Sequence, residues 1–414
     1  MSAQPLLRPL VARRVPATTR AHRRGRSLLV IGALLVAALI GPPPARAGDE
    51  ASPHRARATR ISLQVLPPIR QPGSEPASTN AALTVVTATL TPPRSGQVLT
   101  LERRSQRGWT AAATLSTNAA GRAEFFVRST GRTSYRVVAR HLPGQARAKS
   151  DAVSTDLWGT ADFEDEFTGE SAGSAWQDRI QFYNPWGGRS CSKGSPAAVR
   201  AADGALLLSS MPDPAAATAC PAVDSAGRAL GDFRYRLNGH VSTQDSFDFL
   251  YGVADARMKF QREPGAHPSF WLQPRGLLEH FPTPWGAEID VVEWYGRMGS
   301  RDRMSSTVHA PLPTGDKRSI GGTVSRPSRF LTSRSDTWWR SYHVFSVEWT
   351  PTEYVFRING HEVWRTDEGV SHHPEFLILS MLSSDFELPR LGDRQDDAQT
   401  ASVDWVKVWQ AEVA

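Results

Sequence analysis

The 414-residue sequence lacks several features that define common protein classes. It has only two cysteines, no repeat of 20–50 residues, and no helical periodicity of useful length apart from an Ala-rich segment, 213–230, that could contain one turn of helix. These absences exclude a repeat solenoid and a helical bundle. What remains is a chain of short, turn-separated runs typical of an all-β protein.

The excess of positive charge is confined to the N-terminus. The whole chain has a formal net charge of +7, and eight arginines but no lysine or acid lie within residues 1–47. Removing those eight charges from +7 leaves −1 for the rest. A near-neutral protein lacks the basic surface that nucleic-acid binding requires, so we expect no nucleic-acid partner.

Residues 1–47 have the order of a secretory signal. A basic stretch is followed by the apolar run Leu28–Ile40 and by small residues up to Ala47. This order predicts a signal peptide cleaved after Ala47. The alternative is a membrane anchor, but the run falls short of the ~20 apolar residues that span a bilayer. We therefore expect a secreted, extracellular, monomeric protein without stable membrane insertion.

The two cysteines, Cys191 and Cys220, lie in one loop-rich segment. In an exported protein they are predicted to form a disulfide that stiffens this segment. Two free thiols are the alternative. A zinc site would need further ligands close by in the sequence, and none are present.

Residues 60–148 are predicted to form a small accessory domain. Short β-type runs recur at 8–12-residue spacing with Gly, Pro and Ser between them, which favours an antiparallel sandwich. The pattern resembles the immunoglobulin-like modules of bacterial secreted proteins. Because the segment has no cluster of His, Cys or carboxylates, we expect a spacer, with sugar binding as the alternative. The runs are 82–90, 97–102, 108–115, 121–127 and 134–140.

A larger all-β domain is predicted over residues 162–411, after a linker at 149–161. Asn359-Gly360 between two runs is a strong hairpin signal, since both residues tolerate positive φ. The expected fold is an antiparallel jelly-roll sandwich. The β-type runs are 205–209, 249–259, 269–272, 288–294, 304–309, 343–350, 353–359, 361–365, 375–383 and 401–410.

One of these runs carries three acids, Glu288, Asp290 and Glu293. On a regular strand Glu288 and Asp290 share one face, whereas Glu293 points to the other, among apolar side chains. A buried acid there would be costly. We therefore predict a β-bulge at Val291-Val292, because one extra residue returns Glu293 to the face of the other two acids.

Three carboxylates on one face suit the hydrolysis of glycosidic bonds. A retaining glycosidase uses an ionised carboxylate as nucleophile and a protonated carboxyl as general acid, about 5–5.5 Å apart. Negative charges this close raise one another's pKa, which keeps one group protonated near neutral pH. The middle residue, Asp290, would hold the nucleophile.

The run E-I-D-V-V-E resembles the signature E-x-D-x-x-E of glycoside hydrolase family 16 in its bulged, laminarinase-like form. The resemblance covers about residues 162–410 and implies a concanavalin A-like jelly roll that needs no cofactor. It implies Glu288 as nucleophile, Glu293 as acid/base and Asp290 as the assisting acid. Supporting motifs in family order are 165–167, Trp176, 251–252, Arg257, Lys259, 267–271, 307–309, 345–350 and 403–408.

The resemblance also implies substrate contacts. Trp271 and His309 match positions that contact sugar at or beside the cleaved bond, although an isolated histidine is equally often structural. Where the family usually reads W-P-A-F-W, this chain has His267 in place of the first stacking tryptophan, which puts the substrate in doubt. Further candidates, each with a core or plain-turn alternative, are Asn184, Trp186 and Trp285. Trp294 is predicted to lie in the core.

Two questions stay open at this level. An Asp like Asp404 often binds a structural calcium in the family, and a strand-capping hydrogen bond is the equal alternative. The expected activity is endo-hydrolysis of a β-1,3 or β-1,3-1,4 glucan. A galactan hydrolase or cell-wall transglycosylase with the same site is one alternative. A non-catalytic glycan-binding protein is another, although all three signature acids are intact.

Overall fold

The computed structural model describes residues 58–69, 83–128, 131–142, 145–275, 286–312, 314 and 316–411. The predicted signal peptide and Trp285 lie outside these residues. In the described part of the chain, no helix is long and apolar enough to cross a membrane.

The N-terminal strands form a small sandwich of two sheets, as predicted. One sheet has the order β1-β2-β5, and the other has the order β4-β3-β6-β7 with β8 on β6. Alternate residues of β5 (Ala123, Phe125 and Val127) are buried, as expected for strands with one face on a core. The strands are β1 (Arg60–Val65), β2 (Leu83–Thr91), β3 (Val98–Ser105), β4 (Gly108–Ser116), β5 (Arg122–Arg128), β6 (Ser134–Leu142), β7 (Gln145–Lys149) and β8 (Val153–Ser154).

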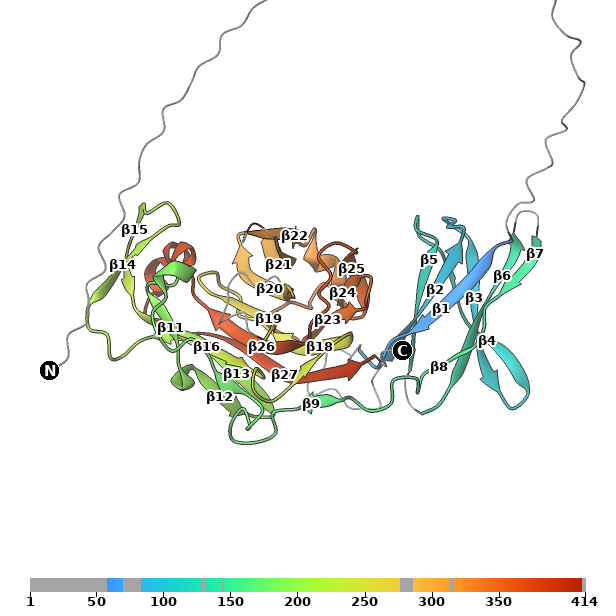
Figure 1. The fold of residues 1–414 in the computed structure, drawn as a ribbon, viewed down its shortest axis with the longest axis horizontal. Coiled ribbons are helices and arrows are strands. Elements are labelled where there is room, and N and C mark those ends of the chain that lie inside the picture. Colours follow the sequence, from blue (N-terminus) through green and yellow to red (C-terminus); the bar gives the residue numbers. More distant parts are fainter. Residues whose placement is uncertain are drawn as a thin grey trace, which may run out of the picture. The chain divides into compact units, whose positions relative to one another are not determined.

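The remaining elements belong to the second all-β part (Figure 1). Its first half comprises β9 (Phe163–Asp165), β10 (Gln177–Asp178), η2 (Pro185–Gly187), β11 (Ser192–Gly194), η3 (Pro196–Ala198), β12 (Val199–Ala202), β13 (Ala205–Pro212), β14 (Ala219–Val223), β15 (Ala229–Arg234), β16 (Arg236–Ser242), β17 (Asp248–Phe249) and β18 (Gly252–Lys259). Its second half comprises β19 (His267–Pro274), β20 (Glu288–Met298), β21 (Arg301–Pro311), β22 (Lys317–Thr323), η4 (Pro327–Phe330), β23 (His343–Trp349), β24 (Tyr354–Ile358), β25 (His361–Thr366), β26 (Glu375–Leu382), η5 (Asp385–Arg394) and β27 (Gln399–Gln410).

These strands build an antiparallel jelly roll of two layers, which confirms the predicted fold class. One layer runs β22-β21-β20-β19-β26-β16 and is called the cleft sheet below. The other runs β25-β24-β23-β18-β27-β13. Strand β16 pairs with both β13 and β26, so the two layers are joined at that edge. The predicted Asn359-Gly360 hairpin connects β24 and β25, with both residues at positive φ.

The core between the layers fixes which side chains of the cleft sheet face outward. Phe270, Leu272, Ile289 and Trp294 are completely buried in one apolar cluster with residues of β18, β23 and β27. Trp294 thus lies in the core, as predicted. Burial of each such side chain contributes roughly 1.5–3 kcal/mol. A shift of β20 by one residue would turn Ile289 and Trp294 away from the core, so the register of this strand is strongly constrained.

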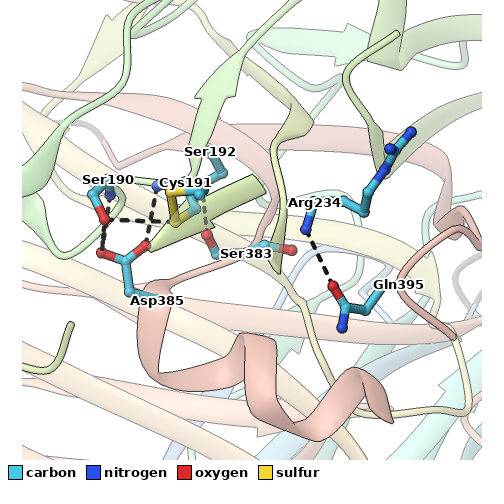
Figure 2. Close-up of a disulfide and its surroundings, with 8 residues drawn as sticks. Ser190, Cys191, Ser192, Arg234, Ser383, Asp385 and Gln395 are labelled. Atoms are coloured by element: carbon cyan, nitrogen blue, oxygen red, sulfur yellow. Dashed lines mark hydrogen bonds between the residues drawn. A yellow bond between two sulfur atoms is a disulfide. The ribbon is translucent and has the colours of Figure 1, made fainter. Parts of the chain in front are cut away.

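The Ala-rich segment does not contain a turn of helix. It includes β14 and the start of β15, which form an antiparallel hairpin. Alternate residues of β14, Cys220 and Ala222, are buried in a small cluster with η5. This tertiary packing outweighs the helix propensity of alanine. Cys220 forms a disulfide with Cys191, which ties the hairpin to the chain that precedes β11 (Figure 2).

Candidate active site

A bulge in β20 gathers the three acids. Along the pairing with β21, Asp290 faces Thr307 and Glu293 faces Ser305, so Val291 and Val292 together oppose one residue. The ladder with β19 shifts at the same place. The predicted bulge is therefore confirmed. Both valines are buried, whereas all three acids line one cleft.

The cleft has a volume of about 660 Å³ and lies on the outer face of the cleft sheet. Besides the acids, its walls come from strands β19, β20, β21, β22 and β26, from the chain between the end of β10 and β11, and from the start of η5. The lining residues are Arg179, Ile180, Asn184, Trp186, Gly187, Arg189, His267, Ser269, Trp271, Gln273, Glu288, Asp290, Glu293, Tyr295, His309, Lys317, Ser380, Leu382, Ser384 and Phe386.

The middle acid, Asp290, is 5% exposed. Burial, together with the charges of Glu293 and Glu288, raises its pKa well above the ordinary range. Its Oδ2 lies 3.1 Å from Nε2 of His309, whose pKa is lowered by burial and by Lys317. Both directions favour the neutral pair, in which the Asp290 carboxyl donates to the imidazole. Nδ1 of the same ring lies 2.8 Å from the Ser319 hydroxyl and fits as the protonated nitrogen.

Glu288 is held by a fixed amide. Gln273 Nε2 donates to Glu288 Oε2 at 2.8 Å, and Arg179 Nη2 donates to Gln273 Oε1 at 3.0 Å. Because the arginine occupies the amide oxygen, the amide nitrogen must face the carboxylate. Burial lowers the pKa of Arg179 to about 10, which leaves it charged at neutral pH. On the other side, Lys317 Nζ lies 3.6 Å from Glu288 Oε1.

We therefore expect Gln273→Leu to reduce kcat by ~10–100-fold while KM changes little, since a hydrogen bond to a charged group contributes about 1.5–3 kcal/mol. The acidic limb of the pH–rate profile should move to higher pH, because the ionised carboxylate loses a donor. Steady-state kinetics from pH 4 to 9 measure both effects. Gln410→Leu, an exposed glutamine at the end of β27, is the control. An unchanged profile for Gln273→Leu would remove this positioning role.

Glu293 accepts two hydrogen bonds from neighbouring hydroxyls. The Tyr295 hydroxyl donates to Oε1 and the Ser305 hydroxyl to Oε2, each at 2.8 Å. Burial and the charge of Glu293 raise the pKa of Tyr295, so its phenol stays a donor. The Tyr295 ring stacks on His267 at 5.2 Å between centroids. The environments of Glu288 and Glu293 therefore differ: an amide and a lysine surround one, and two hydroxyls surround the other.

Five of the six predicted substrate contacts lie in this cleft. Trp271 is partly buried, and its Nε1 donates to the Ser380 hydroxyl at 3.1 Å. Trp186 is 93% exposed on η2, and the Asn184 side chain caps that turn. His309 contacts Asp290, as described above. His267 lines the cleft but is only 5% exposed, because it lies against Tyr295 and bonds to Glu387.

Several lining residues were not predicted from the sequence: Arg179, Arg189, Gln273, Tyr295, Lys317 and Phe386. One sequence signal could have located the last of them. Ser384-Asp385-Phe386-Glu387 has the spacing of a capping box, and the structure forms that box at the start of η5. The box fixes where η5 begins after β26, and Phe386 lies within it. The position of Phe386 at the cleft is therefore fixed as well.

A buried acid supports the start of β20. Glu375 Oε1 accepts a hydrogen bond from the backbone N–H of Ala287, the residue before Glu288, at 3.1 Å. Its side chain is fully buried, and this raises its pKa from 4.5 to about 8. In the unfolded chain the group ionises near its ordinary pKa. The folded state therefore binds the extra proton between these two values, and its stability falls as pH rises across that window.

We expect Glu375→Gln to have a flatter dependence of stability on pH than the wild type. The amide keeps an acceptor for Ala287 but cannot ionise, so the loss of a few kcal/mol between pH 5 and 8 should disappear. Tm measured at pH 5, 6.5 and 8 tests this, with the exposed Glu170→Gln as control. Parallel curves for wild type and Glu375→Gln would contradict the assignment.

Potential metal ligands are limited in the described residues. Glu288, Asp290 and His309 place one ligand atom each within 4.8 Å of one another, and this is the one such group of three or more there. Asp404, the candidate calcium ligand, forms a buried ion pair with Arg257. The structural calcium stays a prediction.

Carboxylates gathered in the open cleft of a jelly roll fit the two-carboxylate chemistry of glycoside hydrolysis. Residues 219–407 match the family described as Glycosyl hydrolases family 16, and this match confirms the resemblance drawn from the signature.

Individual relatives are distant. Gram-negative bacteria-binding protein 3 of Drosophila melanogaster is 27% identical over 138 residues, which are 33% of this chain and 27% of that protein. The laminarinase catalytic domain of Thermotoga maritima shares 17% identity, with 61% of this chain and 98% of that one covered and a TM-score of 0.47. LamAcat of Zobellia galactanivorans shares 18% identity, with 62% and 99% covered and a TM-score of 0.48.

Proposed function

We propose that this protein is a secreted, retaining endo-glycosidase that hydrolyses a β-linked polysaccharide, with a β-1,3 or β-1,3-1,4 glucan as its backbone. The observation that carries the proposal is the bulge in β20, which puts Glu288, Asp290 and Glu293 on one wall of a cleft. Export is supported by the basic and apolar order of residues 1–47 and by the disulfide between Cys191 and Cys220.

In this mechanism Glu288 attacks the anomeric carbon while Glu293 gives its proton to the departing glycosidic oxygen. The bond to the leaving sugar breaks, and a covalent glycosyl ester forms on Glu288. Glu293, now ionised, takes a proton from water as the water attacks the same carbon. The ester breaks, the β-configuration is restored, and both glutamates return to their initial states.

Asp290 and His309 complete this mechanism. A neutral Asp290 adds no third negative charge between the two glutamates, so one of them can remain ionised while the other holds a proton. Its proton is directed at His309 Nε2, which in turn is held by Ser319. Gln273 keeps the carboxylate of Glu288 in place for attack.

A galactan backbone is the second candidate, and one observation favours it. His267 stands where glucanases of the family have a stacking tryptophan, and it is buried between Tyr295 and Glu387. At that position His267 is too buried to stack on a glucose ring. A sugar whose hydroxyl groups are arranged differently from those of glucose, such as galactose, is therefore the second candidate.

A polysaccharide panel tests the proposal. The secreted chain is incubated with laminarin, lichenan and agar, and reducing-sugar release and product length are measured. We expect internal cleavage of one of the two glucans, with the first product observed by NMR as the β-anomer. Release of the α-anomer would exclude retention, and the absence of cleavage on every polysaccharide tested, neutral or acidic, would remove the enzyme proposal.

A further inference from the structure

Arg189 carries a charged group in the cleft wall that has no anionic partner of its own. The Nε atom is buried without a hydrogen-bond partner, and the guanidinium forms no hydrogen bond or ion pair within the described residues. The residue as a whole is only partly buried, and leaving its Nε–H group buried without a partner is unfavourable. Burial lowers the pKa of Arg189, and the charges of Glu387, Glu288, Glu293 and Tyr295 oppose this.

Hydrogen bonds fix the backbone at Arg189 and at the two residues that follow it, so the guanidinium extends from a well-defined position in the cleft wall. Arg189 exchanges two backbone hydrogen bonds with Asn184, at 2.8 and 2.9 Å. The next two residues, Ser190 and Cys191, donate to the carboxylate of Asp385 at distances between 2.7 and 3.2 Å (Figure 2). The Cys191–Cys220 disulfide closes this arrangement.

The same wall offers a surface for a sugar ring. Trp186 is 93% exposed and Phe386 is 50% exposed, and both line the cleft with Arg189. Exposed aromatic side chains on preorganised loops provide the apolar faces on which sugar rings pack. Phe386 directly follows Asp385. The hydrogen bonds from Ser190 and Cys191 to Asp385 therefore fix the backbone next to both Arg189 and Phe386.

The charge of the cleft is compatible with an anionic ligand. Of the three acids that line it in the described part of the chain, Asp290 has its pKa raised well above the ordinary range by burial and by the charges of Glu293 and Glu288, which favours its neutral form. Arg179, Lys317 and Arg189 supply three positive charges. A guanidinium forms its strongest contacts with planar or multidentate anions, to which it donates two parallel hydrogen bonds. A neutral hydroxyl would recover much less of the lost hydration.

We propose that Arg189 binds a carboxylate or sulfate ester on a sugar of the polysaccharide that occupies the cleft. The inference rests on the proposed function and narrows the substrate to a β-linked polysaccharide that carries acidic groups. The aromatic rings of Trp186 and Phe386 hold the sugar, and Arg189 selects its anionic substituent.

Matched substrates test this inference. Laminarin, lichenan and agarose are each compared with two derivatives of the same backbone, one partly oxidised to carboxylates at the primary hydroxyls and one partly sulfated. For the wild type we expect kcat/KM to be ~10–100-fold higher on one derivative than on its neutral parent, the effect of one charge-assisted contact. The derivative on which kcat/KM rises shows whether Arg189 binds a carboxylate or a sulfate ester.

Substitution of the arginine should remove this preference. For Arg189→Met we expect the ratio of kcat/KM on the derivative to kcat/KM on the neutral parent to fall to about 1, because only the derivative loses a charge-assisted contact. Arg200→Met, an exposed arginine of β12 outside the cleft, should keep the preference. Equal losses by Arg189→Met on parent and derivative would overturn the inference, since the side chain would then bind neutral sugar.

The wild type alone gives a second readout that needs no variant. Raising NaCl from 20 to 500 mM should reduce the advantage of the derivative and leave the parent unaffected, because salt screens the contact. Cleavage of a parent backbone without any preference for its derivatives would overturn the inference and leave the proposed function intact. Failure to cleave any backbone or derivative would instead remove the proposed function.

Discussion

Glu288→Gln is expected to reduce hydrolysis of the polysaccharide by ~10⁴-fold or more, because the covalent route is lost with its nucleophile. The substitution is nearly isosteric, and the amide can still accept a hydrogen bond from Gln273. Folding should therefore be unaffected, and the loss should fall on kcat rather than KM. Reducing-sugar release, with thermal unfolding as the folding check, measures the effect. Glu170→Gln, an exposed glutamate outside the cleft, should match the wild type.

Replacing Glu288 with a smaller residue tests whether it is the nucleophile, in addition to showing that activity is lost without it. Glu288→Gly opens space beside the anomeric carbon, and azide can enter it. With an aryl β-oligosaccharide that has a good leaving group, azide should restore turnover and give the α-glycosyl azide, since a single displacement inverts the carbon. Formation of the β-azide would show that the nucleophile lies elsewhere, and wild-type rates for Glu288→Gln would show that Glu288 is not needed.

The bulge illustrates what could be predicted from the sequence. Placing Glu293 on the face opposite Glu288 would have buried an acid beside Ile289 and Trp294, and the structure puts both of those residues at 0% exposure. The free-energy cost of burying that acid depends only on residues of the same strand, so it can be judged from the sequence of that strand alone. The jelly roll and the core position of Trp294 follow from the same alternation of apolar and polar residues.

What the sequence did not reveal depends on contacts between distant segments. Gln273 acquires its role only because Arg179 holds its amide oxygen from 94 positions away. Asp385 reaches Ser190 across 195 positions. The hairpin of β14 and β15 overrode an Ala-rich composition because Cys220 and Ala222 pack against η5. No periodicity or short motif encodes such pairings, which form only when the sheet is assembled.

Glu293→Ala is expected to lower kcat on polysaccharide by ~10²–10⁴-fold, the usual contribution of a general acid. The loss should depend on the leaving group, because an aryl glycoside with an acidic phenol departs without protonation. On that substrate the first step should stay fast and a burst of phenol should precede slow hydrolysis of the glycosyl ester. The basic limb of the pH–rate profile, which reflects loss of the proton from Glu293, should be absent in Glu293→Ala.

Azide distinguishes this acid/base from the nucleophile. In Glu293→Ala it should attack the ester on Glu288 without base assistance, raise turnover of the aryl glycoside and yield the β-glycosyl azide. Two inversions preserve the configuration, so the product is opposite to that of Glu288→Gly. Tyr295→Phe removes one donor to Glu293 and keeps the carboxyl, and we expect it to show neither the burst nor the rescue. Equal losses on polysaccharide and aryl glycoside by Glu293→Ala would contradict the acid/base role. In that case Glu293 would contribute to substrate binding or to the position of Tyr295 and Ser305, the two groups whose hydrogen bonds end on it.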